Sequence, residues 1–183
     1  MIAVLDANVL YPVLVRDILL SLADIGLFVP KWTITINEEW TRNLLTNRPA
    51  ISRSSLIRLI EMMNASFPAA NVTNYLHMVD DLTLPDPDDR HVLAAAIKSK
   101  ATHIVTANTK DFPQKYLTLY GLKIEHPDTF ISDIIQTEPL LAMLAFNTML
   151  ARFKNPPLNP ETVLPMLEKC GLSNSAQLLN SKS

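Results

Sequence analysis

The sequence predicts an α/β protein whose parallel sheet is followed by an all-helical C-terminal extension. Up to about residue 126, short apolar runs of strand length alternate with helical patterns, and beyond that point only helical patterns occur. Strands that alternate with helices form a parallel sheet covered on both faces. The chain has 183 residues, of which 48% are hydrophobic, so it can bury a sizeable core. We therefore expect an α/β domain over residues 1–126 and a helical extension over residues 127–183.

The individual elements follow from hydrophobic spacing and from residues that begin or end helices. Residues 2–5 form a continuous apolar run of strand length, and residues 12–26 show helical spacing that ends at Gly26. Thr35 and Glu38 have the spacing of a capping box, which predicts a helix start at Thr35. The other predicted elements of this domain are helices over 36–46, 53–64 and 87–99, and strands near 71–73, 103–106 and 123–125.

The C-terminal part has clear helix boundaries. Asn159 is a good N-cap because Pro160 follows it at the first helical position. Between Leu140 and Leu150 the apolar residues occur on all sides of the predicted helix, so this helix either packs inside the protein or covers a partner surface. The predicted helices are 128–135, 139–152, 160–169 and 174–179.

Composition excludes several kinds of site. The three glycines, Gly26, Gly121 and Gly171, are isolated, so no glycine-rich loop can surround a phosphate with backbone amides. P-loop and dinucleotide-binding sites are therefore excluded. The single cysteine, Cys170, excludes an internal disulfide and a zinc site built from paired thiolates.

The sequence also favours a cytoplasmic protein. Its N-terminal run lacks the pattern of a signal peptide. The longest apolar stretch without charge, residues 139–151, is shorter than the roughly 20 residues that cross a bilayer. We expect no contact with a membrane.

A net charge of −2 hides a separation of charge along the chain. The arginines Arg42, Arg48, Arg53 and Arg58 lie in a segment without acidic residues, whereas residues 80–89 contain five acids and no base. The arginines either form a solvated helix face or contact phosphate groups. The acids need a positive partner, because like charges close together are costly.

Four carboxylates are expected at one edge of the sheet. Asp6 follows the first strand, and ligands of open parallel sheets bind at the carboxyl ends of the strands. Glu39 and Asp89 lie on the apolar faces of predicted helices, where a carboxylate needs a partner or a metal ion. Asp111 comes shortly after the strand that ends near Thr106. Such a cluster of oxygen ligands favours Mg²⁺ or Mn²⁺.

Two neighbours of Asp89 have simpler interpretations. Asp86, with Pro87 behind it, has the pattern of a helix N-cap. His91 lies off the apolar stripe of its helix and is expected at the surface.

These motifs resemble those of the PIN-domain nucleases, and more narrowly those of the VapC toxins of bacterial toxin–antitoxin modules. The resemblance covers about residues 1–126, and the helical tail resembles the C-terminal region of longer members. The matching segments, in chain order, are VLDANVL from Val4, EWTRNL from Glu39, DPDDRHVLAAA from Asp86, TANTKDFP from Thr106 and, in the tail, NPPL from Asn155.

The resemblance implies a PIN-like three-layer α/β/α fold with a short, mostly parallel sheet. It also implies a metal-dependent endoribonuclease that hydrolyses RNA with a metal-activated water. The implied residues are Asp6, Glu39, Asp89 and Asp111 for catalysis and for Mg²⁺ or Mn²⁺, with Asn8, Asp86, Thr106 and Asn108 as support. With RNA as the substrate, the basic segment is expected to contact the RNA backbone through Arg42, Arg48, Arg53 and Arg58. Many members carry an aspartate where Asn108 aligns, so either Asn108 or Asp111 completes the metal site. The implied partners are an RNA substrate such as tRNA or rRNA, a cognate antitoxin and a second copy of the chain.

Two alternatives stay open at this point. Asp6-Ala7-Asn8 faintly resembles the start of haloacid-dehalogenase-like phosphatases, in which the aspartate forms an aspartyl-phosphate, but the lysine expected later in the chain is not clear. A PIN-like module could also bind RNA or protein without cutting it. The retention of four acids argues against this second alternative.

Overall fold

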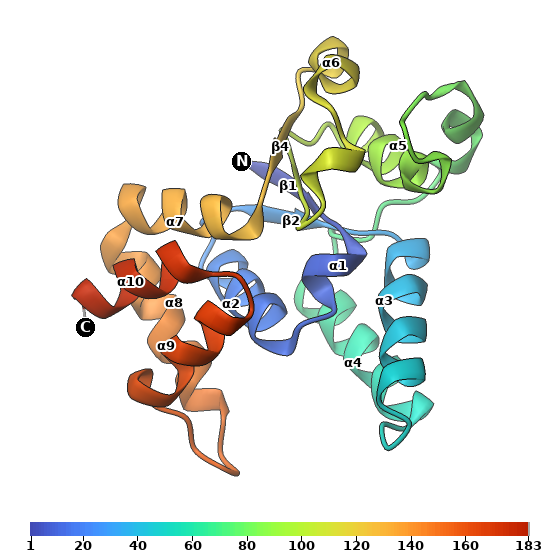
Figure 1. Ribbon diagram of the computed structural model, residues 1–183. Helices are drawn as coiled ribbons and strands as arrows, with labels where there is room; N and C mark the ends of the chain where they lie inside the picture. The colour runs from blue at the N-terminus through green and yellow to red at the C-terminus, as the bar shows by residue number, and fades with distance from the viewer. Residues whose placement is uncertain (183) are drawn as a thin grey trace. The chain divides into compact units, whose positions relative to one another are not determined.

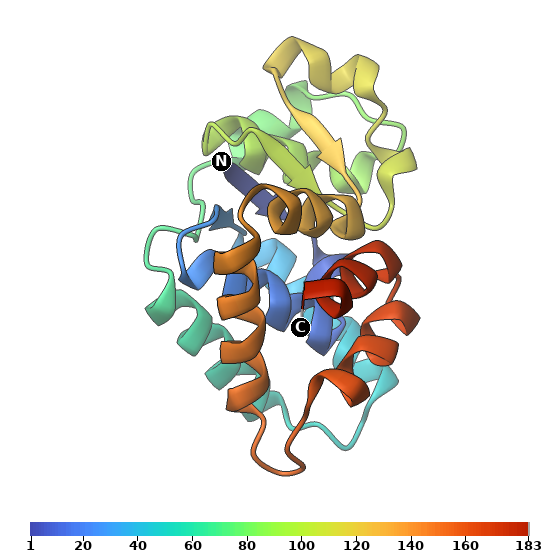
Figure 2. The same ribbon diagram turned by 90° about the vertical axis from the view of Figure 1, so that its left-hand side faces the viewer.

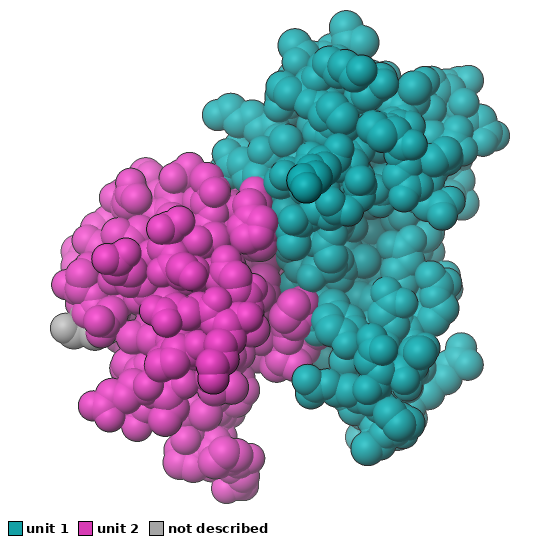
Figure 3. All heavy atoms as spheres, viewed as in Figure 1, with its two compact units in different colours: residues 1–11, 29–125 teal, residues 12–28, 126–183 magenta. Residues whose placement is uncertain are grey.

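The computed structural model describes residues 1–182 and divides into two compact units. Unit 1 comprises residues 1–11 and 29–125, and unit 2 comprises residues 12–28 together with the chain from His126 onward. Figure 3 shows unit 1 in teal and unit 2 in magenta. The long helix near the N-terminus, within residues 12–28, therefore groups with the C-terminal helices, while the division into domains at residue 126 stays a prediction.

Within the described residues, the strands are short and the helices many (Figure 1). The strands are β1 (Ile2–Leu5), β2 (Val29–Lys31), β3 (His103–Val105) and β4 (Lys123–Glu125). The α-helices are α1 (Ala7–Leu10), α2 (Val13–Asp24), α3 (Ile34–Asn47), α4 (Arg53–Ser66), α5 (Arg90–Lys98), α6 (Gln114–Leu117), α7 (Pro127–Thr137), α8 (Pro139–Arg152), α9 (Pro160–Lys169) and α10 (Ser173–Lys182). The 3₁₀ helices are η1 (Leu76–Asp81), η2 (Pro87–Asp89), η3 (Thr109–Asp111) and η4 (Thr118–Tyr120).

The four strands form one parallel sheet in the order β2-β1-β3-β4. Its central strands are β1 and β3, in which Leu5 lies opposite Val105. This register brings the residues that follow, Asp6 and Thr106, to the same edge of the sheet. Figure 2 shows β1, β3 and β4 running in the same direction. The predicted PIN-like α/β fold class with a parallel sheet and a helical C-terminal region is confirmed.

Helix α5 packs against β1 and β3. Its three consecutive alanines, Ala94, Ala95 and Ala96, are fully buried, as are Ala3, Val4 and Leu5 of β1. Small side chains allow the helix to approach the strands closely, and this fixes the position of the acidic segment just before α5.

The predicted start of α3 is wrong. The N-cap is Thr33, whose hydroxyl accepts a hydrogen bond from the backbone N–H of Ile36 over 3.1 Å. Thr35 lies inside the helix, and its hydroxyl pairs with that of Tyr75 at 2.7 Å. Because Thr35 lies inside the helix and is not its N-cap, Thr35 and Glu38 do not form a capping box, and Glu38 is exposed.

One predicted strand is also wrong, and a different one was missed. Residues 71–73 form no strand, because Asn71 makes a single isolated bridge with Trp32. The strand at this edge is β2, whose central residue is Pro30. A proline cannot donate to a sheet ladder, so it weakens the sequence signal of a strand and is tolerated mainly at an edge.

Unit 2 is a cluster of helices in which α2 packs against α8 and α10 packs against α7 and α9 (Figures 1 and 2). The predicted C-terminal helices are confirmed, as is the Asn159 N-cap, which forms a capping box with Thr162. An edge-to-face pair of Phe28 and Phe130, with centroids 5.0 Å apart, belongs to this core.

Helix α8 has one buried face and one exposed face. Ala142, Phe146 and Met149 are buried, whereas Leu140 and Leu144 are 86% and 54% exposed. Within residues 1–182, no helix is both long and apolar enough to span a bilayer.

Candidate functional site

Hydrogen bonds fix the carboxylate of Asp6 at the end of β1. Its Oδ1 accepts from the Ala7 backbone N–H over 2.7 Å, and its Oδ2 accepts from the Asn8 amide over 2.6 Å and the Thr106 hydroxyl over 2.7 Å. Asp6 is only 5% exposed. Burial raises the pKa of Asp6, and the hydrogen bonds from Thr106 and Ala7 oppose this rise.

A second set of hydrogen bonds ties the segment after β1 to the segment after β3. The Asn8 side-chain oxygen accepts from the Ala107 backbone N–H over 2.9 Å. The Thr106 hydroxyl accepts from the Asn8 amide over 2.8 Å and from the Asn108 backbone N–H over 3.1 Å. Three residues expected to support the site, Asn8, Thr106 and Asn108, therefore lie together around Asp6.

Three of the expected carboxylates, those of Asp6, Glu39 and Asp89, line one cavity of about 440 Å³. The remaining lining residues are mostly polar. They are Ala7, Asn8, Tyr11, Arg42, Asn43, Asn47 and Asp88.

The tightest group of carboxylates differs from the expected set. One oxygen each of Asp86, Asp89 and Asp111 lies within 4.8 Å of the others. Asp89 belongs both to this group and to the cavity, whereas Asp86 and Asp111 do not line the cavity. Asp86 also caps η2, as predicted, by accepting from the Asp88 backbone N–H over 2.9 Å.

Asn108 and Asp111, the two candidates for completing the metal site, are hydrogen-bonded to each other. The Asn108 side-chain amide donates to Oδ2 of Asp111. This contact holds the Asn108 amide beside the Asp111 carboxylate.

The carboxyl group of Asp89 lies among other acidic side chains. Burial raises its pKa, and the neighbouring Asp6, Asp111 and Asp86 raise it further, to about 7. The nearby His91 opposes the rise. Three acids act on this one carboxyl group, so a cation between them would relieve the repulsion.

His91 is buried, so the expectation that it lies at the surface is wrong. It is 8% exposed, and its Nε2 lies 3.0 Å from Oε1 of Glu39. Its Nδ1 is buried without a hydrogen-bond partner among the described residues. Residues 92–96 are all buried, so α5 is buried on more than the one apolar face that its spacing predicts. His91, which lies beside that face, is therefore buried as well. The unbroken apolar run after His91 was the signal that could have revealed this.

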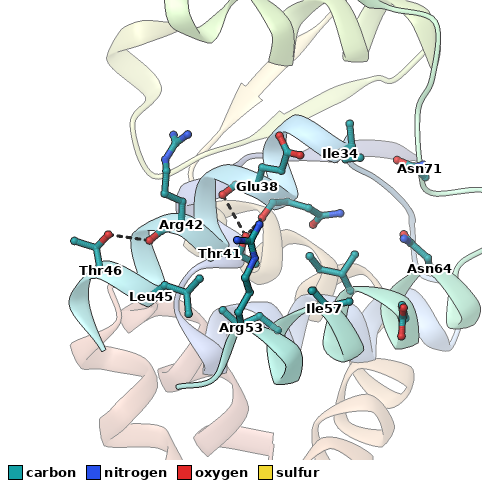
Figure 4. A pocket seen from close by; sticks show the side chains of 14 residues that line it. Ile34, Glu38, Thr41, Arg42, Leu45, Thr46, Arg53, Ile57, Asn64 and Asn71 are labelled. Carbon is teal, nitrogen blue, oxygen red and sulfur yellow. Dashed lines mark hydrogen bonds between the residues drawn. The ribbon is translucent and has the colours of Figure 1, made fainter. Parts of the chain in front are cut away.

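The four arginines expected to contact RNA lie on or beside α3 and α4. Arg42 and Arg53 line a groove of about 700 Å³ between these helices (Figure 4). Arg48 follows α3 and Arg58 lies on α4, and both are exposed. Arg42 also lines the acidic cavity, so it belongs to both hollows.

The donor atoms of the acidic group fit a hard divalent cation. All are carboxylate oxygens, the ligand type that Mg²⁺, Mn²⁺ and Ca²⁺ prefer over softer metals. Oxygens that bind one such ion at about 2.1–2.5 Å lie no more than about 4–5 Å apart, which the separations within the Asp86, Asp89 and Asp111 group allow.

A short parallel sheet with carboxylates gathered at one edge is the arrangement expected of a PIN domain. The PIN domain family model matches residues 3–110, which is more than half of the chain. The chain belongs to the PIN domain family. Residues 127–181 match a second model, described as the VapC50 C-terminal domain.

A curated relative points the same way. The chain is 38% identical over 79 residues to the protein named "Putative ribonuclease VapC50" of Mycobacterium tuberculosis (strain ATCC 25618 / H37Rv). The matching segment covers 43% of this chain and 47% of that relative, so it spans about half the length of the curated protein. No solved structure matches the chain significantly.

Proposed function

We propose that this protein is a metal-dependent endoribonuclease and the toxin of a toxin–antitoxin module. The observation that carries the proposal is the group of Asp86, Asp89 and Asp111, of which Asp89 lines a cavity together with Asp6 and Glu39. The similarity to a protein named as a VapC ribonuclease supports the choice of RNA as the substrate.

In the proposed reaction, Asp89 would hold Mg²⁺ or Mn²⁺ together with Asp6, Glu39 and Asp111, with Asp86 beside them as support. A bound divalent cation lowers the pKa of an attacking water and stabilises negative charge on the phosphate. Thr106 and Asn8 keep the Asp6 carboxylate in place, and His91 does the same for Glu39.

Water and not the RNA 2′-hydroxyl is the proposed nucleophile. Cleavage through the 2′-hydroxyl by a pair of histidines needs both side chains at the phosphate, and no histidine is among the described residues that line the cavity. The products therefore carry 5′-phosphate and 3′-hydroxyl ends.

The proposed partners follow from the same function. The RNA backbone is attracted by the positive charge of Arg42, Arg48, Arg53 and Arg58. Of these, Arg42 lines the cavity itself. We further propose a cytoplasmic protein that forms a homodimer and is inhibited by a cognate antitoxin.

The test is cleavage of tRNA and rRNA by the purified protein with Mn²⁺, with and without EDTA. We expect cleavage that needs the metal, yields 5′-phosphate ends, and is lost in Asp6→Ala and Asp89→Ala. Asp80→Ala, which removes an acid outside the cavity, is the matched control. Activity that survives both site substitutions would overturn the proposal.

The alternative is a non-catalytic PIN-like module. A wild-type protein that binds RNA but neither cuts it nor binds Mn²⁺ in calorimetry would favour that alternative.

A further inference from the structure

We infer that the neutral end of the acidic cavity binds one RNA base beside the scissile phosphate, through Tyr11, Asn43 and Asn47. This inference rests on the proposed function, because it names the part of the substrate that the same cavity would take.

Helix α3 distributes two kinds of side chain along the cavity. Glu39, Asn43 and Asn47 are spaced four residues apart, so they lie on one face of the helix, and all three line the cavity. A rise of 1.5 Å per residue places Asn47 roughly 12 Å along the helix axis from Glu39. The cavity thus continues from carboxylates at one end to neutral amides at the other.

The amide end offers hydrogen-bonding groups that the protein itself does not use up. The Asn47 amide donates to the Tyr11 hydroxyl over 3.2 Å. This bond leaves the Asn47 side-chain oxygen, its second amide hydrogen and the Tyr11 hydroxyl hydrogen for a ligand. The Asn43 side chain, which is exposed in the cavity, makes no hydrogen bond within the described residues.

These groups match the chemistry of a nucleobase. Asparagine amides pair with the donor and acceptor edge of a base, and an aromatic ring provides a surface on which an unstacked base can lie. Tyr11 is held in place as the C-cap of α1, since its backbone N–H donates to the Ala7 carbonyl over 3.0 Å.

Charge orients the substrate along the cavity. Arg42 lies three residues after Glu39 and lines the cavity on the same helix. Its guanidinium attracts a phosphate, while the neutral amide end contributes no negative charge that would repel RNA. A strand with its phosphate at Arg42 and the carboxylates would place an adjacent base at Asn43 and Asn47.

The test compares Asn43→Ala, Asn47→Ala and Tyr11→Phe with the wild-type protein. Sequencing the 5′ ends cut from a random RNA pool gives the base preference at the cleavage site. Fluorescence anisotropy in EDTA then gives the affinity for a short RNA of the preferred sequence and for one with that base changed.

We expect Asn43→Ala and Asn47→Ala to weaken binding of the preferred RNA roughly 5- to 150-fold, the effect of losing a paired base contact, and to relax the base preference. Tyr11→Phe keeps the ring and loses only the hydroxyl, so its effect should be smaller. Mn²⁺ affinity, measured by calorimetry without RNA, should not change. Asn147→Ala, at an exposed position of α8, is the matched control.

Variants that cut and bind with the wild-type base preference would overturn this inference and leave the nuclease proposal intact. A wild-type protein that neither binds nor cuts RNA would overturn the proposed function, and this inference with it.

Discussion

The hydroxyl of Thr106 donates a hydrogen bond to Oδ2 of Asp6 over 2.7 Å and so connects the carboxyl ends of β1 and β3. Thr106 is fully buried and Asp6 nearly so. The same hydroxyl accepts two hydrogen bonds, from the Asn8 amide and the Asn108 backbone. Thr106 is therefore the junction between the buried carboxylate and the segment that carries Asp111.

We expect Thr106→Val to lower the free energy of unfolding by about 1.5–3 kcal/mol, because a hydrogen bond to a buried charged group is lost while the side-chain shape is kept. Urea unfolding in EDTA measures this change. The pKa of Asp6, already raised by burial, should rise further, since the hydrogen bond from Thr106 opposes that rise.

Thr118→Val is the control for this substitution. Thr118 is exposed, and within residues 1–182 its hydroxyl bonds only to the Gln114 carbonyl one turn before it, so the change should stay within about 0.5 kcal/mol. Equal stabilities of the two variants would contradict the assigned role of Thr106.

The parallel sheet and most helices were predictable because the apolar residues of each element recur at the spacing of a strand or a helix. The C-terminal helices have strong local signals such as Asn159 followed by Pro160. Strand β2 was not predictable, because Pro30 weakens its pattern and its pairing with β1 depends on the fold. The start of α3 was misplaced because Thr33 and Thr35 are both possible N-caps, and it is Thr33 that accepts from the Ile36 N–H.

For the site, the sequence predicts which carboxylates lie near the sheet edge. It does not predict which of them lie closest together and which line the cavity. Asp6, Glu39 and Asp89 follow from strand ends and helix faces. The grouping of Asp86 with Asp89 and Asp111 depends on the geometry of η2 and η3, two single turns that periodicity does not detect. The bond between His91 and Glu39 joins two helices, and no spacing rule relates them.

Replacing Asp89 by asparagine should stabilise the metal-free protein at pH 8. The pKa of Asp89 is raised from 3.8 to about 7 in the folded state, so between these values the folded state holds a proton that the unfolded state has lost. Stability therefore falls as the pH rises through this window, and the loss is complete above about pH 7. The asparagine side chain of the variant is neutral throughout and avoids this loss.

The measurement is the Tm of wild type and Asp89→Asn in EDTA at pH 4 and pH 8. We expect the variant to gain at pH 8, by roughly 2–4 °C for each kcal/mol of relieved repulsion, and to gain little at pH 4. Mg²⁺ should raise the Tm of wild type more than that of the variant. Asp81→Asn, at an exposed acid outside the group, should show no such pH dependence, and an unchanged Tm of Asp89→Asn at pH 8 would refute the prediction.

Substitution of His91 should weaken metal binding without a matching loss of stability. In His91→Leu, Glu39 loses its hydrogen-bond partner, and Asp6 and Asp89 lose a group that lowers their pKa, so protons compete better with the metal. Loss of a residue that orients a metal ligand typically costs 10- to 100-fold in affinity. The free energy of unfolding should change less than the free energy of metal binding. The reason is that the substitution also removes the buried Nδ1, which has no partner among the described residues.

Calorimetry with Mn²⁺ measures this effect, and urea unfolding in EDTA measures stability. His91→Gln, which retains a donor, should recover part of the affinity, whereas His77→Leu at an exposed histidine should leave it at the wild-type value. A His91→Leu variant that binds Mn²⁺ as tightly as wild type would show that Glu39 needs no support from the imidazole.

In unit 2, Asp128 should be the most important polar residue for the stability of α10. Its Oδ2 accepts from the Asn174 backbone N–H over 3.0 Å, and its Oδ1 accepts from the Ser175 backbone N–H over 2.8 Å and the Ser175 hydroxyl over 2.7 Å. These N–H groups lie in the first turn of α10, where no helical carbonyl can satisfy them and a negative charge is favourable. Asp128→Ala leaves them unpaired in a buried position, so we expect a loss of about 2–4 kcal/mol in the free energy of unfolding by urea and faster hydrogen exchange of the α10 amides.

Asp128→Asn keeps a side-chain acceptor and should lose less stability, while Asp133→Ala, at an exposed position of the same helix α7, should lose under about 0.5 kcal/mol. Wild-type exchange rates for α10 in Asp128→Ala would mean that packing against α7 and α9 alone holds this helix in place.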